Sequence, residues 1–328
     1  MNAIMSETQI TKNQHYIPQF YLRKFQNAQN KVQILSCEYN KIVTPRSPKS
    51  ICSEEFYYGA ETGVPDKVSQ EVETMFSNLE TFLAKKLPPI EEKLLSGKEI
   101  DTDEKWTLGF LMSMIWIRGP VMREQNRRMV EDITKQMMNF TFSMSDAHVK
   151  CFFDKFDSTR GETTSPEMRQ KLKESFLNKD HKLNVNNAVH IGMFENIHNF
   201  ANLFTAQDWF VYISKAKSGF ITSDNPVAEV FPEMKGSYGA SFFNREHYFT
   251  LSPVIIIHCK YPNKKNGKGL RRKTYYESDD IKILSLNISI ARYALKFVYA
   301  KEKECLEKVL KIVESHKRQR YKSLFNSS

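Results

Sequence analysis

The strongest constraint on the fold is a change in the period of the apolar residues, which occurs twice along the chain. Between Asp66 and Phe204, apolar side chains recur every three or four residues, as in "DKVSQEVETMFSNLETFLAKKL". This spacing predicts helices that each bury one face. On either side of this region, short runs of β-branched and aromatic residues end at turn residues, which predicts strands. We therefore expect an α+β protein.

The order of these segments predicts the organisation of the chain. We expect a small N-terminal β unit, a central helical region, a C-terminal antiparallel sheet and a terminal amphipathic helix. No internal repeat and no Gly/Ser linker divides the sequence, so a single domain over 1–328 is expected. Its predicted parts are 13–60 (motif and β unit), 66–205 (helices), 208–300 (antiparallel sheet and a helix) and 301–328 (C-terminal helix).

The charge of the chain favours a polyanionic partner. The sequence has 48 Lys and Arg against 38 Asp and Glu, a net charge of +10. Much of the excess is local, in "YPNKKNGKGLRRKTYY" (261–276) and "HKRQRYK" (316–322). Nucleic acid is the partner class that such segments favour, and solvated loops or helix ends are the alternative.

Other classes of protein fit the sequence poorly. The most apolar stretch, "LGFLMSMIWI" (108–117), is shorter than the ~20 residues that span a bilayer, so no membrane partner is expected. Five cysteines without a CxxC pair suit a reducing cytoplasm and predict no zinc site. No pattern for a metal or another cofactor is present, and we predict none.

The segment "QHYIPQFYLRKF" (14–25) is the first candidate site. Pro18 suits the first turn of a short helix, which would place Gln19 and Arg23 on one face, four residues apart. His15 precedes this helix and could join them at one point. The aromatic residues would anchor the turn to the core, and Tyr21 could add a hydrogen-bond donor.

The segment "FITSDNPV" (220–227) is the second candidate. A strand that ends in Ser-Asp-Asn-Pro predicts a tight turn, in which Asp224 can bond its own backbone and Pro226 keeps Asn225 out of helical geometry. A plain Asx-turn is the main alternative to a functional role for Asp224 and Asn225. A turn at the end of a buried strand can also present side chains to a cleft.

Two further polar residues, Arg118 and Asn287, fall on apolar helix faces. Arg118 lies near the apolar face of its helix, and a buried cation needs a carboxylate, for which Glu73 and Glu80 are candidates. An ion pair between helices is the favoured interpretation, and substrate binding by Arg118 is the alternative. Asn287 needs hydrogen-bond partners, and Arg292 follows it as a possible substrate ligand.

These motifs carry a resemblance to a family. "HYIPQFYLRKF", "EEFYY", "WIRGP", "FITSDNPV" and "LN…ARYALKFVYA" occur in an order that resembles the bacterial family of the domain of unknown function 4238. The resemblance spans about residues 13 to 300. It implies one architecture in which the motifs act together, and it brings no established catalytic role to any residue.

The first functional hypothesis is an enzyme that acts on nucleic acid or a nucleotide. His15, Tyr21, Arg23 and Asp224 would be catalytic, with His15 as general acid or base and Arg23 opposite developing phosphate charge. We expect metal-independent phosphodiester chemistry, because these motifs offer no second carboxylate. A pair of Glu73 and Glu80 acting with Asp224 on a metal is a weaker variant. The predicted substrate ligands are Gln19, Asn225, Arg118, Arg292, Lys268, Arg271 and Arg272.

The second hypothesis is a non-catalytic binding or sensing protein, for example in a bacterial defence or toxin system. The His, Arg and Asp side chains would then form a structural polar network between the N-terminal segment and the C-terminal sheet. The C-terminal amphipathic helix would allow self-association. An active site requires the cluster to open onto a pocket, whereas a structural network would be sealed.

Overall fold

The computed structural model describes most of the chain between residues 10 and 313. The described ranges are 10–61, 64, 66–178, 183–215, 219–230, 245–261 and 275–313. Lys268, Arg271 and Arg272, which were predicted to bind substrate, lie outside these ranges, as does the basic segment 316–322.

The N-terminal part forms the predicted β unit around a short helix. Strands β2 (Val32–Ser36) and β3 (Lys41–Arg46) pair as an antiparallel hairpin, and β1 (Asn13–His15) pairs with β4 (Ser53–Glu55). Helix α1 (Gln19–Leu22) starts directly after Pro18 and continues as a 3-10 turn at Arg23–Phe25. A second 3-10 turn occupies Pro48–Ser50.

The central region is helical, as predicted. Asp101 and Glu104 form a capping box, in which each side chain accepts from the other's backbone N–H over 2.8 and 3.0 Å. No helix in the described part of the chain is both long and apolar enough to cross a bilayer. The helices are α2 (Lys67–Leu95), α3 (Thr102–Arg118), α4 (Pro120–Phe142), α5 (Asp146–Arg160), α6 (Pro166–Leu177), α7 (Ala188–Gly192) and α8 (Ile197–Thr205).

The last third carries most of the strands. The Asp279 side chain caps α9 by accepting from the N–H of Lys282. The elements are β5 (Asp208–Ser214), β6 (Thr222–Ser223), β7 (Val227–Val230), β8 (Glu246–Ser252), β9 (Ile255–Lys260), β10 (Tyr275–Ser278), α9 (Asp280–Arg292), β11 (Phe297–Ala300) and α10 (Lys303–Val313).

Two sheets organise the body of the molecule. The larger has the order β10-β5-β9-β8-β7 and is antiparallel except for β10, which runs parallel to β5. The smaller has the order β3-β2-β11-β6, so the N-terminal hairpin shares a sheet with two strands from the end of the chain. The N-terminal β unit is therefore joined to the C-terminal part by backbone hydrogen bonds.

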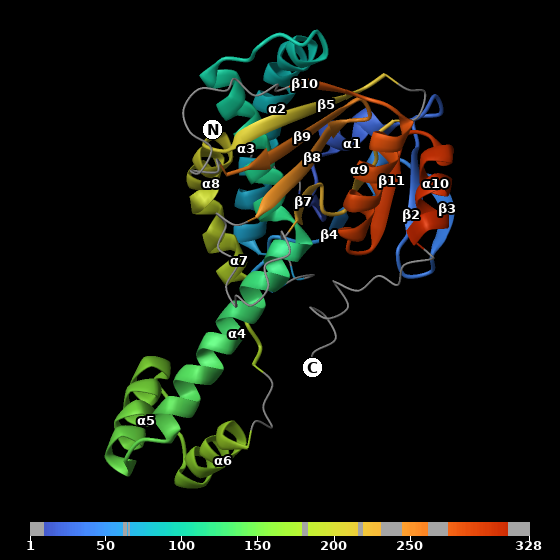
Figure 1. Ribbon diagram of the computed structural model, residues 1–328. Helices are drawn as coiled ribbons and strands as arrows, with labels where there is room; N and C mark the ends of the chain where they lie inside the picture. Colours follow the sequence, from blue (N-terminus) through green and yellow to red (C-terminus); the bar gives the residue numbers. More distant parts are fainter. Residues whose placement is uncertain are drawn as a thin grey trace, which may run out of the picture.

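Alternation along the strands divides the larger sheet into two faces. Trp209, Val211 and Ile213 of β5 belong to the main core together with residues of α3 and α8. We call this the inner face. The opposite, outer face carries Phe210 and Tyr212. In Figure 1 the outer face points to the viewer, with α9 in front of one end of the sheet and α3 behind it.

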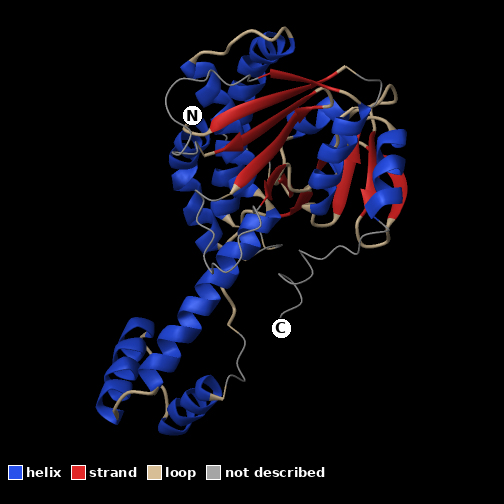
Figure 2. Cartoon of the chain, viewed as in Figure 1, coloured by secondary structure: helices blue, strands red, loops and turns tan. Residues whose placement is uncertain are grey.

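Helices α4, α5 and α6 form a lobe that projects from the body. Figures 1 and 2 show α4 leaving the body and carrying α5 and α6 at its far end. Their contact has a small apolar cluster of its own, built from Phe142, Val149, Phe153 and Phe176. The lobe is therefore held together separately from the main core.

The described part of the C-terminal helix packs inside the chain. Cys305, Leu306 and Val309 of α10 are buried in a second core with residues of α9, β2 and β11. The apolar face expected to support self-association is thus covered by the same chain over Lys303–Val313. This part of α10 does not present an apolar face to another copy, which argues against the predicted route of association.

Candidate functional site

His15, Gln19 and Arg23 lie in one row along the N-terminal segment 14–25, as predicted. We call this segment the opening turn. Gln19 Nε2 is 3.5 Å from His15 Nδ1, and Arg23 Nη2 donates to Gln19 Oε1 over 3.4 Å. Both distances are at the long end of the hydrogen-bond range. Arg23 is exposed, whereas His15 is only 7% exposed. The row therefore runs from the surface into the interior.

The imidazole of His15 is largely buried. Its Nε2 atom is buried, and burial lowers the pKa of the ring against the opposing effect of the Pro48 backbone. The backbone carbonyl of His15 accepts hydrogen bonds from Tyr58 Oη, over 2.8 Å, and from Arg118 Nη2. A general base must reach its substrate, and only a small part of His15 is exposed.

Arg118 forms the predicted ion pair between helices α2 and α3. Its Nη1 lies 2.7 Å from Glu80 Oε1, and its Nε donates to Tyr58 Oη over 2.7 Å. The guanidinium also lies 4.1 Å from the centre of the Phe76 ring, and the residue is 1% exposed. All three guanidinium nitrogens have partners, so the placement supports a structural role and leaves substrate binding by Arg118 without support.

Glu73 is the second carboxylate near Arg118, and it predicts a pH effect on stability. Its Oε2 is buried with no hydrogen-bond partner among the described residues, and burial raises its pKa to about 7, with Arg118 opposing. The folded state therefore binds the proton of the Glu73 carboxyl more tightly than the unfolded chain does. As a result, the free energy of unfolding falls as the pH rises from about 4.5 to about 7.

Replacing Glu73 by Gln should remove this dependence. At about pH 8 the free energy of unfolding of Glu73→Gln should exceed that of the wild type by on the order of 2 kcal/mol, and near pH 4 the two should agree. Urea denaturation at the two pH values measures the difference. A difference of the same size at both would show that the Glu73 carboxylate is not responsible.

Tyr21 joins the opening turn to both sheets. Its hydroxyl donates to the Thr250 carbonyl over 2.7 Å and lies 2.6 Å from Thr222 Oγ1. The ring stacks on Phe249 at 5.7 Å and is fully buried, and burial raises the pKa of the phenol. Tyr21 is therefore placed as an anchor, away from any surface where substrate could meet it.

Asp224 closes the connection between α9 and β11. Its carboxylate accepts the backbone N–H groups of Leu295, Lys296 and Phe297 over 2.8, 2.6 and 3.0 Å. Its own N–H donates to the Phe297 carbonyl over 3.0 Å. Burial raises the pKa of Asp224 to about 6, against the three amides, which lower it. The chain bends at 224–226, but the Asp224 carboxylate binds a distant segment and not the adjacent backbone, which was the predicted partner.

Two asparagines support the same region. Asn225 Nδ2 donates to the Tyr293 carbonyl over 3.3 Å. Asn287 accepts from the Ile221 N–H over 3.0 Å and donates to the Gly219 carbonyl over 3.1 Å, which supplies the partners that its place on an apolar face required. Both side chains are buried. They hold the strand that leads to Asp224.

The predicted meeting of His15, Arg23 and Asp224 is absent. These three described residues make no hydrogen bond or ion pair with one another, and both oxygens of Asp224 are bound by backbone amides. Arg292 is exposed at the end of α9. Nowhere in the described ranges do three His, Cys, Asp or Glu side chains gather as metal ligands would. The catalytic roles stay predictions, without support from the geometry.

The outer face of the larger sheet carries a feature that sequence reasoning missed, a contiguous row of rings. We call it the aromatic row. Tyr212 and Tyr276 stack at 5.3 Å, and Phe210 lies 6.3 Å from Tyr276 and 5.7 Å from His258. His258 stacks on Tyr248 at 4.2 Å with an angle of 6° between the planes. Phe210 and His258 form the buried middle, and the tyrosines are half-buried.

Charged side chains surround the aromatic row. Lys260 Nζ lies 5.0 Å from the Phe210 ring centre, and Lys282 Nζ lies 4.9 Å from that of Tyr212. Glu246 Oε2 accepts a hydrogen bond from His258 Nε2 over 2.8 Å, and this bond lowers the pKa of the carboxyl. Alternation in "DWFVYIS" could have placed Phe210 and Tyr212 on one face. Nothing local in the sequence indicates that β10 lies beside them.

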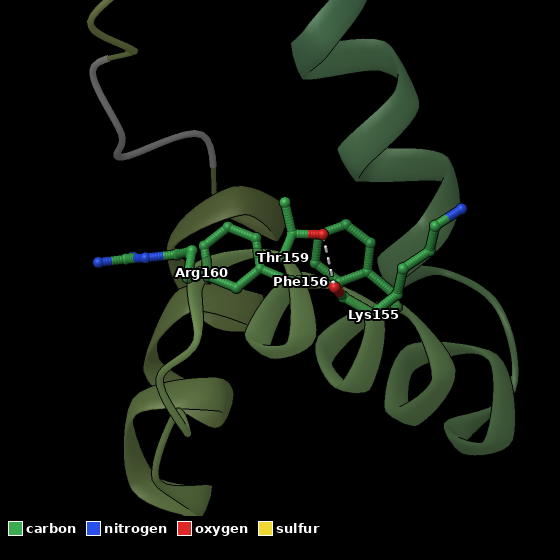
Figure 3. A pocket seen from close by; sticks show the side chains of 5 residues that line it. Lys155, Phe156, Thr159 and Arg160 are labelled. Carbon is green, nitrogen blue, oxygen red and sulfur yellow. Dashed lines mark hydrogen bonds between the residues drawn. The ribbon is translucent and has the colours of Figure 1, made fainter.

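A shallow pocket of about 230 Å³ lies elsewhere, on α5 in the lobe. Figure 3 shows its lining, which comes from that helix alone. Arg160 lies 5.3 Å from the Phe156 ring centre, and the Thr159 hydroxyl bonds the Lys155 carbonyl over 3.0 Å. The lining has no carboxylate and no imidazole, and its polar side chains are Lys155, Thr159 and Arg160.

The protein is therefore an α+β protein whose body is built on two sheets. Tyr21 of the N-terminal segment 14–25 contacts both of these sheets, and Asp224 binds the connection between α9 and β11. The chain belongs to the family described as Protein of unknown function (DUF4238), whose model matches residues 13–304. No curated protein and no solved structure matches it.

Proposed function

We propose that the protein binds single-stranded nucleic acid on the aromatic row and does so without catalysis by His15. The aromatic row is the observation on which this proposal rests. Bases stack on aromatic rings irrespective of sequence, because every base has a π-face. Five rings from four strands lie in contact on one sheet face, and the tyrosines at its two ends are only half-buried.

Cations at the edges of the row support a polyanionic ligand. Lys260 and Lys282 lie over two of the rings and could meet phosphates beside stacked bases. The sequence between Lys260 and Tyr275 adds six Lys and Arg residues and no acid, and it includes Lys268, Arg271 and Arg272. Chain connectivity fixes the two ends of this basic segment at β9 and β10, the strands that carry His258 and Tyr276.

The enzymatic alternative has weaker support. It requires His15 to reach a phosphodiester, and the His15 ring is largely buried. The observed partners of Arg118, Tyr21 and Asp224 are those of a structural network. A role in bacterial defence stays a prediction, and it is compatible with a nucleic-acid-binding protein.

Fluorescence anisotropy with a labelled single strand of about 15 nucleotides tests the proposal, since that length covers the binding sites of known single-strand binders. Tyr276→Ala should weaken binding about tenfold, because one stacking ring is lost. Tyr39→Ala is the matched control. Tyr39 is 65% exposed on the β2–β3 hairpin with Lys41 5.3 Å from its ring centre, and it lies outside the aromatic row. Its replacement should leave binding unchanged.

The same oligonucleotide separates binding from catalysis. We expect RNA and DNA strands to stay intact with and without EDTA. Equal affinities for Tyr276→Ala and wild type would refute the proposed surface. Cleavage that His15→Ala abolishes without lowering the melting temperature would instead restore the enzymatic hypothesis.

A further inference from the structure

An apolar stripe runs along the exposed side of α4. Met129, Ile133, Met137 and Phe140 are 49–68% exposed, and Met144, just after the helix, is 38% exposed. At about 100° per residue, the four helical positions fall within an arc of about 80°. We call these five residues the α4 stripe.

The opposite side of α4 packs against α5 and α6. Phe142 is buried in the small cluster of the lobe, and Met138 packs against that cluster. These two residues lie about 180° to 220° around the helix from Met129. The stripe is therefore not the face that holds α5 and α6. In the described part of the chain, no core cluster includes a residue of the stripe.

The spacing and the charge of the stripe suit pairing with another helix. Ile133 and Phe140 are seven residues apart, as are Met137 and Met144, which is the repeat of a helix-pairing seam. The segment 136–145 has no charged side chain. Cores of homodimer interfaces are likewise apolar and depleted in charge.

We propose that two copies of this chain associate through the α4 stripe, with their α4 helices antiparallel. Figure 1 shows α4 projecting downward from the body, so a parallel pair would force two bodies together at the same end, whereas an antiparallel pair separates them. A two-fold axis near Met137 also sets the uncharged segment 136–145 of each copy against residues 129–138 of the other, where Met129 and Ile133 lie.

The exposed area is sufficient for such a pair. Five side chains with exposures of 38–68% present roughly 500 Å² per copy, or about 1,000 Å² in a pair, which reaches the lower limit for a specific interface. Methionines form three of the five positions, and their flexible side chains adapt readily to a facing helix.

Light scattering coupled to size exclusion tests the association. The wild type should be dimeric at tens of micromolar. Met137→Glu should weaken dimerisation at least about 100-fold, because the two-fold axis brings both new charges together. Met168→Glu is the matched control: Met168 is 50% exposed on α6, outside the stripe, and its replacement should leave the dimer intact. Both variants should keep the wild-type melting temperature.

Cross-linking tests the orientation. In a Cys151→Ser background, which removes the exposed native thiol, Met137→Cys should form a covalent dimer with a short bismaleimide. Met129→Cys should not, since its two copies would lie about 24 Å apart along antiparallel helices. A monomeric wild type, a dimer that survives Met137→Glu, cross-linking through Met129→Cys, or binding to lipid vesicles that Met137→Glu abolishes would each overturn the proposal.

Discussion

Replacing Arg118 by Met should lower the free energy of unfolding by about 3–5 kcal/mol, since the change breaks a buried ion pair and leaves its partners behind. Glu80 would lose its cation, and Tyr58 Oη and the His15 carbonyl would lose a donor. These groups join α2, α3 and the opening turn. Loss of the guanidinium should therefore loosen the opening turn as well as the contact between the helices.

Urea unfolding at neutral pH measures the effect, with Arg292→Met as the control. Arg292 is exposed on α9, so its replacement should change stability by no more than about 0.5 kcal/mol. Adding Glu80→Gln to Arg118→Met should recover part of the loss, because the stranded carboxylate is removed. If both arginine variants unfolded at the same urea concentration, the structural role of Arg118 would be ruled out.

Asp224→Ala should destabilise the protein by at least about 3 kcal/mol, because it leaves three backbone N–H groups in the interior without an acceptor. The amides of Leu295, Lys296 and Phe297 should also exchange hydrogen faster. Asp279→Ala is the variant with which this loss of stability is compared. Asp279 caps α9 at an exposed position, and the loss of such a cap costs about 1 kcal/mol.

The stability of Asp224→Ala also distinguishes structure from catalysis. We expect the folded variant to keep its affinity for single strands, because Asp224 lies outside the aromatic row. A variant with wild-type stability that loses a nucleic-acid activity would instead assign Asp224 to an active site.

Local features of the fold were predictable because their causes are local. The capping box at Asp101 and Glu104 needs residues three apart, and Gly119 with Pro120 separates α3 from α4. The ion pair of Arg118 was predictable because a buried cation needs a carboxylate and the neighbouring helix offered two, Glu73 and Glu80. Glu80 is the observed partner.

Long-range pairing was not predictable in the same way. Nothing near Val32 indicates that β2 pairs with β11, and nothing near Tyr275 indicates that β10 runs parallel to β5. The predicted cluster failed for this reason, since Asp224 takes backbone partners more than seventy residues further along the chain. The aromatic row depends on the same pairings, which bring Tyr276 beside Tyr212 and Tyr248 beside His258.

The central claim is that nucleic acid meets the outer face of the larger sheet while the N-terminal polar residues hold the fold together. Photocross-linking of a 4-thiouridine strand to the wild-type protein, followed by mass spectrometry, tests this claim most directly. Cross-links should fall on Tyr248 and Tyr276 or on their immediate neighbours. Cross-links at His15 or Arg23, or a strand that binds with no cross-link on the sheet, would contradict the account.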